Sequence, residues 1–193
     1  NVPRCDSSGA AMPPPTTRSR TGVGTRDIGS PADSENMAVV STHHVPVHQQ
    51  ALSVDAIEAA SIRIADAVAR TPLEICPRLS ADTGAEIFLK REDLQAVRSY
   101  KLRGAYNVMA QLSAEELSRG VVAASAGNHA QGVAFACRSM QVPGRIYVPT
   151  TTPKQKRDRI RWHGGDFVEL KAVGDTYDAA AAAAQDDVMR TGS

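Results

Sequence analysis

Hydrophobic positions along the chain change their spacing between Val121 and Gly132. Val121–Ala124 form a short continuous apolar run, which is typical of a buried strand. From Asn128 onward the apolar residues recur at helical spacing, at Ala130, Val133, Ala134, Cys137 and Met140. The pattern predicts a strand, a tight turn of small residues and a helix. In an open α/β sheet such a junction lies at the carboxyl end of a strand, where ligands bind, and the helix start offers free backbone N–H groups to an anion.

The same spacing argument predicts further elements on both sides of this junction. Before it we expect helices over residues 53–69 and 99–112, a helical turn over 79–83 and a strand over 86–90. After it we expect strands over residues 145–149 and 166–170, and helices over 153–163 and 176–189. Three strand–helix units in a row predict a parallel sheet with helices on its faces.

Capping residues locate several of these helix ends. Asp55 and Glu58 are expected to open the first helix in the manner of a capping box, and Ser113 with Glu116 forms an S-x-x-E box that opens a further short helix. Ser99 and Thr152 are expected N-caps of the helices that follow them. Four glycines mark expected helix ends: Gly84, Gly120, Gly164 and Gly192.

Composition places this pattern in an ordinary globular chain. With 193 residues, 42% of them apolar, the chain has enough material for one domain and its core. The 22 basic and 21 acidic residues nearly cancel, so the overall charge favours neither nucleic acid nor an anionic membrane as a partner. The scattered cysteines, Cys5, Cys76 and Cys137, have neither disulfide-framework nor zinc-site spacing.

The N-terminal stretch differs from the rest of the chain. Residues 1–50 are rich in Pro, Ser, Thr and Gly with little apolar periodicity, which predicts a disordered leader, and Met37 is a plausible start. His43, His44 and His48 lie there, but no Cys or carboxylate joins them at ligand spacing, so an unstructured polar tract is favoured over a metal site. The chain shows neither a membrane span nor a signal peptide, which predicts a cytoplasmic protein.

Lys101 is the anomaly in the helix expected from residue 99. It lies in the first turn and shares a side with Ala105 and Met109, four and eight positions on. A buried ammonium beside a positive helix N-terminus would have a lowered pKa, which gives a nucleophilic amine. Alternatively, Lys101 reaches solvent from the helix end. On the pattern alone the solvent-directed interpretation is favoured.

A second basic feature has a simpler interpretation. The stretch KQKRDRIR, residues 154–161, carries five basic residues and could contact phosphates. Asp158 is interleaved among them on an expected surface helix, so a solvated charged face is favoured.

The 125–132 turn is not one of the best-known phosphate loops. A P-loop requires Lys and then Ser or Thr after its second glycine, whereas Gly132 is followed by Val133 and Ala134. SYKLRGA (residues 99–105) together with SAGNHAQG (residues 125–132) resembles the pyridoxal-phosphate enzymes of the tryptophan-synthase-β fold type, specifically biosynthetic threonine dehydratases. RTPL, LKREDLQ and TPKQKRDRI extend the resemblance over about residues 53–193.

The resemblance implies roles for five residues of these motifs. Lys101 would be the Schiff-base lysine that holds pyridoxal 5'-phosphate and then acts as the base, which favours the nucleophilic amine over the solvent-directed one. Asn128 would hydrogen-bond the oxygen on the cofactor ring. Ser125, Gly127 and His129, together with Asn128, would bind the substrate carboxylate at the helix start. No metal is implied.

The implied reaction is the dehydration and deamination of L-threonine to 2-oxobutanoate and ammonia, the first step of isoleucine biosynthesis. Serine racemases of this fold type carry a second serine where this chain has Ala126, and a methyl group cannot transfer a proton, so racemisation is disfavoured. An L-serine dehydratase, a related lyase and an inactive fragment stay open as alternatives. A homo-oligomer is expected for the longer protein.

The resemblance also implies how the chain divides. Residues 51–115 would be the N-terminal part of the large cofactor domain, and residues 116–193 would be a nearly complete small α/β domain. In this fold type the glycine-rich loop that binds the cofactor phosphate lies beyond the residues matching Gly192. The expected fold is therefore a three-layer α/β structure around a parallel sheet, with most of the large domain missing.

Overall fold

The computed structural model describes residues 53–193, so the expectations for the leader, including Met37 and the three histidines before residue 50, lie outside the described residues. The first half contains α1 (Val54–Arg63), β1 (Leu73–Ile75), α2 (Pro77–Thr83), β2 (Phe88–Lys90), the 3-10 turn η1 (Glu92–Leu94), α3 (Lys101–Met109) and α4 (Ala114–Arg119). The second half contains β3 (Val121–Ala124), α5 (Asn128–Met140), β4 (Gly144–Val148), α6 (Lys154–Gly164), the 3-10 turn η2 (Gly165–Phe167), β5 (Val168–Ala172) and α7 (Tyr177–Thr191).

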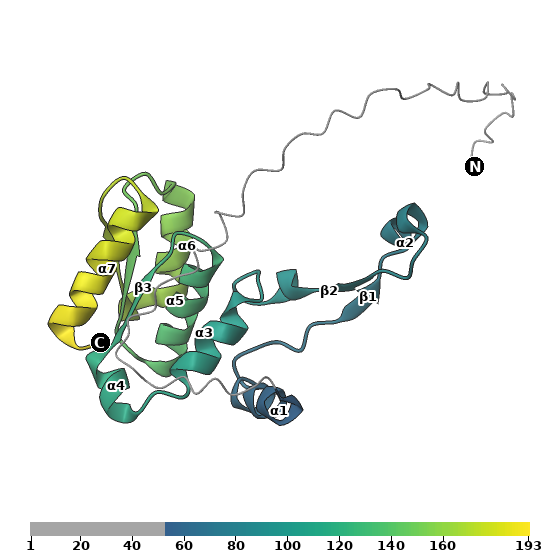
Figure 1. Ribbon diagram of the computed structural model, residues 1–193, viewed down its shortest axis with the longest axis horizontal. Coiled ribbons are helices and arrows are strands. Elements are labelled where there is room, and N and C mark those ends of the chain that lie inside the picture. The colour runs from purple at the N-terminus through teal and green to yellow at the C-terminus, as the bar shows by residue number, and fades with distance from the viewer. Residues whose placement is uncertain (1–52) are drawn as a thin grey trace, which may run out of the picture. The chain divides into compact units, whose positions relative to one another are not determined.

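The predicted parallel sheet is confirmed, with strand order β3-β4-β5. Residues alternate between its two faces along the central strand β4. Ile146 and Val148 are fully buried in the cluster that contains residues of α3, α5 and α6, whereas Tyr147 packs with Ala180 and Ala184 of α7. Helices therefore cover both faces, with α7 on one side and α5 and α6 on the other (Figure 1). This is the expected three-layer arrangement.

A second, two-stranded sheet was only half predicted. Strand β2 pairs antiparallel with β1, with Leu73 opposite Lys90, and β1 was missed because three residues between two prolines carry no periodic signal. Leu73, Ile75 and Phe88 are each more than half exposed. Exposed apolar side chains of this size, from both strands of one sheet, are typical of a surface that packs against further protein.

The boundaries of the first helix were predicted incorrectly. Ser53 is the N-cap, since its hydroxyl accepts a hydrogen bond from Ala56 N–H, so the expected Asp55–Glu58 box does not open α1. The helix ends at Arg63 because the chain then folds into short turns, such as Ala67 N–H to the Ile64 carbonyl. None of its residues is buried, and Ile57 is 57% exposed, so the expected apolar face is not covered here.

The remaining caps show which local signals are reliable. Ser113 and Glu116 form the predicted capping box, and Gly84 and Gly192 end α2 and α7 in left-handed conformations. Ser99 and Thr152 are not caps, because Tyr100 and Pro153 occupy those positions without side-chain bonds. Helix α6 runs through Gly164, and the η2 turn delays β5 to Val168, two residues later than predicted.

The Cys137 thiol gives a direct test of the packing under the sheet. Its side chain is fully buried between α5 and β4, and burial raises the pKa of the thiol to about 12. We expect N-ethylmaleimide to leave Cys137 unmodified in the native chain while it alkylates the partly exposed Cys76. Peptide mass mapping before and after denaturation measures this. Equal native rates at the two thiols would contradict the packing.

Candidate active site

The predicted strand, turn and helix are observed at the carboxyl end of β3. Ser125 N–H donates to the Tyr147 carbonyl (3.1 Å), which extends the sheet ladder one residue past β3. Gly127 N–H then donates to the Ser125 hydroxyl (3.3 Å), which closes the turn. Gly127 is the N-cap of α5 and makes no side-chain bond, and the first intrahelical bond comes from Gln131 N–H. The start of α5 therefore presents uncapped N–H groups, as an anion site requires.

Gly132 brings the start of α3 against this turn. A Cβ atom at Gly132 would lie 3.1 Å from the carbonyl carbon and oxygen of Lys101 and 3.2 Å from Leu102 N. Only glycine allows two backbones to approach this closely without a shift. Leu102 is fully buried at this contact. The first turn of α3, which carries Lys101, is thus fixed next to the first turns of α5.

The Lys101 ammonium acts electrostatically on His129. The pKa of His129 is lowered, mainly because neighbouring atoms desolvate the imidazole and secondly because of the Lys101 ammonium. Part of the His129 side chain is nevertheless exposed. The structure therefore brings together the two predicted motifs, residues 99–105 and 125–132, which are separate in the sequence.

Lys101 is exposed, so the expected burial of its ammonium is wrong for this chain. Its Nζ lies 5.3 Å from the centroid of the Tyr100 ring, and the buried residues of α3 are Leu102, Ala105 and Met109. The reason is position, because side chains on a helix lean toward its N-terminus and Lys101 is the first residue of α3. It projects past the packed part of the helix, as the solvent-directed interpretation expected.

The other predicted residues lie on a single turn. Ser125 and Gly127 are half-buried, whereas Asn128 and His129, the first two residues of α5, are exposed. Their side chains and N–H groups thus surround one helix start. The assigned role of each stays a prediction.

Two polar residues next to this turn were not predicted. Gln131 and Ser99 are 5% and 7% exposed, yet Gln131 Oε1 and Ser99 Oγ have no hydrogen-bond partner within the described residues. Buried polar atoms are normally paired, so such atoms beside Asn128 and Lys101 are a mark of a binding site. The sequence offered only a weak signal, namely a glutamine three positions after Asn128 on a helix.

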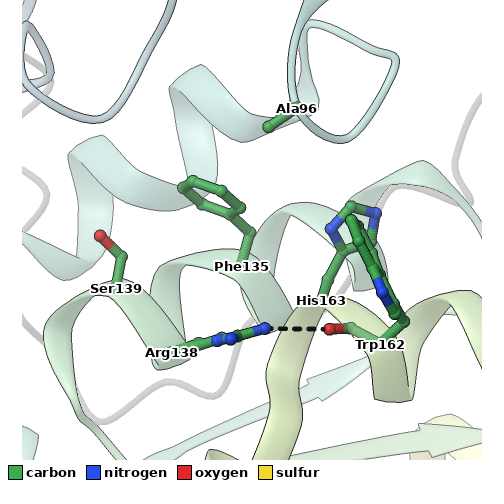
Figure 2. A pocket seen from close by; sticks show the side chains of 6 residues that line it. All are labelled: Ala96, Phe135, Arg138, Ser139, Trp162 and His163. Carbon is green, nitrogen blue, oxygen red and sulfur yellow. Dashed lines mark hydrogen bonds between the residues drawn. The ribbon is translucent and has the colours of Figure 1, made fainter.

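A surface pocket away from this turn is a different feature. A pocket of about 330 Å³ is lined by Ala96, Phe135, Arg138, Ser139, Trp162 and His163 (Figure 2). Arg138 Nη1 donates to the Trp162 carbonyl across its floor (3.3 Å). None of the predicted site residues lines this pocket, so the pocket is not part of the predicted site around Lys101.

Residues 53–193 contain neither a metal-ligand cluster nor a membrane-spanning helix. Among residues 53–193, His, Cys, Asp and Glu side chains do not gather in groups of three that could hold a metal ion. Over the same residues, every helix is too short or too polar to cross a bilayer.

Fold and site together define an α/β protein that presents a lysine on one helix start next to the uncapped N–H groups of another. Comparison with known families agrees with this class. Residues 64–192 match the family described as "Pyridoxal-phosphate dependent enzyme", and the chain belongs to this family.

Curated relatives show which members of this family the chain is similar to. The chain is 66% identical over 137 residues to L-threonine dehydratase biosynthetic IlvA of Mycobacterium tuberculosis (strain H37Rv), covering 71% of this chain and 32% of that protein. The corresponding protein of Corynebacterium glutamicum is 63% identical over 137 residues, which cover 71% of this chain and 31% of that protein. The chain therefore spans about a third of the length of the curated relatives it matches.

Solved structures confirm the predicted fold class. The processed form of threonine deaminase isoform 2 from Solanum lycopersicum superposes with a TM-score of 0.64 at 42% identity, over 73% of this chain and 39% of that chain. Maize serine racemase gives a TM-score of 0.68 at 31% identity, over 74% of this chain and 43% of that chain. Both are covered only in part, as expected for a piece of this fold.

The residues at the turn fit the cofactor of the family. Pyridoxal phosphate is an anionic aldehyde with ring hydrogen-bonding groups, so it requires an accessible amine and polar partners. Lys101 would supply the amine, since it lies exposed at a helix start. Asn128 would supply an exposed amide, and Gln131 Oε1 and Ser99 Oγ are buried atoms without a hydrogen-bond partner among the described residues. The chemistry of this donor set agrees with the family assignment.

Proposed function

We propose that residues 53–193 form the lysine-bearing part of a pyridoxal-phosphate-dependent L-threonine dehydratase, which converts L-threonine into 2-oxobutanoate and ammonia in isoleucine biosynthesis. One observation supports this most strongly. Gly132 packs against the backbone of Lys101, so the residue that carries the amine is held beside the first turns of α5 in a chain 66% identical to a biosynthetic threonine dehydratase. Residues 51–115 would then belong to the large domain and 116–193 to the small one.

Lys101 has two tasks in this proposal. Its Nζ would hold the cofactor aldehyde, and the same nitrogen, when it is a free amine, would take the proton from the substrate Cα. When bound, the cofactor ring delocalises the negative charge that develops at Cα. Asn128 would hydrogen-bond the oxygen on the cofactor ring and so help to hold the cofactor beside Lys101.

The start of α5 holds the substrate carboxylate. The Ser125 hydroxyl and the backbone N–H groups of Gly127, Asn128 and His129 surround one helix N-terminus, where a negative charge is stabilised. Because the pKa of His129 is below its ordinary 6.5, the imidazole is neutral at pH 7 and adds a hydrogen-bonding group without a second positive charge beside Lys101.

The substrate and the assembly are part of the same proposal. The methyl side chain of Ala126 cannot exchange a proton with the substrate, which disfavours racemisation. The longer protein is proposed to be a cytoplasmic homo-oligomer. The isolated 193 residues are expected to have no dehydratase activity, since they span about a third of the relatives' length.

A chimera tests this proposal. Residues 53–193 replace the matching segment of the Mycobacterium tuberculosis relative, and the formation of 2-oxo acid is followed with L-threonine and with L-serine. We expect kcat/KM for threonine to exceed that for serine by about tenfold or more, because one methyl group in an apolar pocket is worth about 1–3 kcal/mol. Equal or higher values with serine would favour the alternative L-serine dehydratase, and an inactive chimera would contradict the proposal.

A further inference from the structure

Glu92 has an unusually complete set of partners for a surface-loop carboxylate. Arg103 binds it with two nitrogens, Nε to Oε2 (2.9 Å) and Nη2 to Oε1 (2.8 Å). The Thr71 hydroxyl donates to Oε1 (2.5 Å), and Gln95 Nε2 approaches Oε2 at 3.4 Å. Only 15% of the Glu92 side chain is exposed. We call these four residues, Thr71, Glu92, Gln95 and Arg103, the Glu92 clamp.

The Glu92 clamp connects three chain segments that are separate in sequence. Gln95 pairs with the backbone of Ala69 in both directions, accepting from its N–H (3.0 Å) and donating to its carbonyl (2.8 Å). Lys90 Nζ donates to the Thr71 carbonyl (2.6 Å). The RTPL, LKREDLQ and SYKLRGA motifs therefore meet in one hydrogen-bonded network whose last member, Arg103, lies in the first turn of α3.

Helix α3 needs such a partner because its own start is poorly stabilised. Its N-cap, Tyr100, makes no side-chain bond, and its first turn contains no acidic residue. Lys101 and Arg103 instead place two positive charges at the positive end of the helix dipole, which destabilises the first turn. Glu92 supplies from another segment the negative charge that this turn lacks.

The clamp and Gly132 hold the same turn through different contacts. Gly132 fixes the backbone of Lys101 and Leu102 against α5, while the clamp holds Arg103 to the 69–71 and 90–95 segments. Loss of the clamp removes one of these two restraints and leaves the Gly132 contact to hold the first turn of α3 by itself. Lys101, the first residue of the helix, would then be held less firmly beside α5.

We propose that the Glu92 clamp is the positioning device that holds Lys101 beside His129, with Glu92 and Arg103 as positioning residues. The catalytic importance of the clamp rests on the proposed function, whereas its hydrogen bonds are observed in the chain itself. Hydrogen bonds from Arg103, Thr71 and Gln95 hold the pKa of Glu92 down to about 2. The carboxylate is therefore charged throughout the physiological pH range.

The His129 imidazole reports on the position of Lys101. An NMR titration of the 193-residue chain, with the histidine signals assigned by substitution, gives the His129 pKa without cofactor. We expect Glu92→Gln to raise this pKa toward its ordinary 6.5, because the Lys101 ammonium moves away. A direct field effect has the opposite sign, since removing a negative charge lowers the pKa of a histidine.

Controls separate positioning from general loss of structure. His163 is buried on α6, where burial lowers its pKa, so an unchanged His163 titration shows that the fold is intact. Glu115→Gln removes a comparable carboxylate from the exposed Glu115–Arg119 pair and should leave His129 unaffected. If Glu92→Gln fails to fold, Thr71→Val is used instead, because it removes only the hydrogen bond from Thr71 to Glu92. We expect this variant to raise the His129 pKa by a smaller amount.

Two outcomes would overturn the inference. One is a His129 pKa that stays constant or falls in Glu92→Gln. The other is the same rise when Glu92→Gln is added to a Lys101→Gln chain, in which no ammonium is left to move. An inactive chimera combined with the expected rise would refute the dehydratase proposal and leave the clamp standing, so the two failures are distinguishable.

Discussion

Replacing Lys101 with arginine in the chimera is expected to lower kcat for L-threonine by about 10⁴-fold or more. Arginine keeps the positive charge and the length of the side chain, but its guanidinium stays protonated and cannot serve as a nucleophile or a base. The initial rate of 2-oxo acid formation measures the loss. The substituted protein should also fail to acquire the visible absorbance of bound pyridoxal phosphate.

The surroundings of the other lysines make this prediction specific. Among the other lysines of residues 53–193, Lys90 is bonded to the Thr71 carbonyl, Lys154 pairs with Asp158, and Lys171 pairs with Glu169 over the Tyr147 ring. Lys156 is exposed on α6, within the basic stretch 154–161. Lys101 Nζ instead lies beside an aromatic ring at the start of α3. Lys154→Arg is the matched control and should retain full activity. Activity that survives Lys101→Arg would exclude this residue as the cofactor lysine.

Gly132→Ala is expected to separate α3 from α5 at the site. The new methyl group would lie 3.1 Å from the Lys101 carbonyl and 3.2 Å from Leu102 N, and these are backbone atoms that cannot rotate away. Overpacking of this kind costs about 1–3 kcal/mol of unfolding free energy. A displacement of about 1 Å at the reacting amine would lower the activity of the chimera by about 100-fold.

Gly104→Ala is the control for this substitution. Gly104 lies within α3 and a Cβ atom there meets nothing within 4 Å, so alanine should stabilise the helix by about 1 kcal/mol and preserve activity. Thermal unfolding and the rate with L-threonine are measured for both variants. Equal behaviour of the two alanine variants would mean that the Gly132 contact does not position Lys101.

The sequence predicted those parts of the fold whose signals are local. A continuous apolar run gave β3, and helical spacing from Asn128 gave α5, because a single buried face dictates each pattern. The Ser113–Glu116 box was also correct, since both of its hydrogen bonds lie within one turn. Together with the repeated strand–helix units, these signals were enough to predict the parallel sheet.

Features that depend on distant contacts were not predicted. The tie between Glu92 and Arg103 and the contact of Gly132 with Lys101 join residues of different elements, so periodicity carries no trace of them. The same holds for Asp187, which is 3% exposed and binds Arg145 of β4 (2.5 Å). It appeared in the sequence only as one residue of an expected helix.

Lys101 shows where a helical pattern is insufficient. Its spacing placed Lys101 on the same side of the helix as Ala105 and Met109, and those two residues are indeed buried. The pattern does not record where the packed part of a helix begins, however, and Lys101 is the residue at which α3 starts. The motif SYKLRGA singles out Lys101 by resemblance alone, and its role as the cofactor lysine stays a prediction.

The position of the cofactor on the chain tests the account most directly. The chimera is loaded with pyridoxal 5'-phosphate, reduced with borohydride and digested, and the peptides are mapped by mass spectrometry. We expect the reduced pyridoxyl group on Lys101, and we expect the Lys101→Arg chain to carry none at this position. A pyridoxyl group on Lys90, or on any other lysine in place of Lys101, would contradict the central claim.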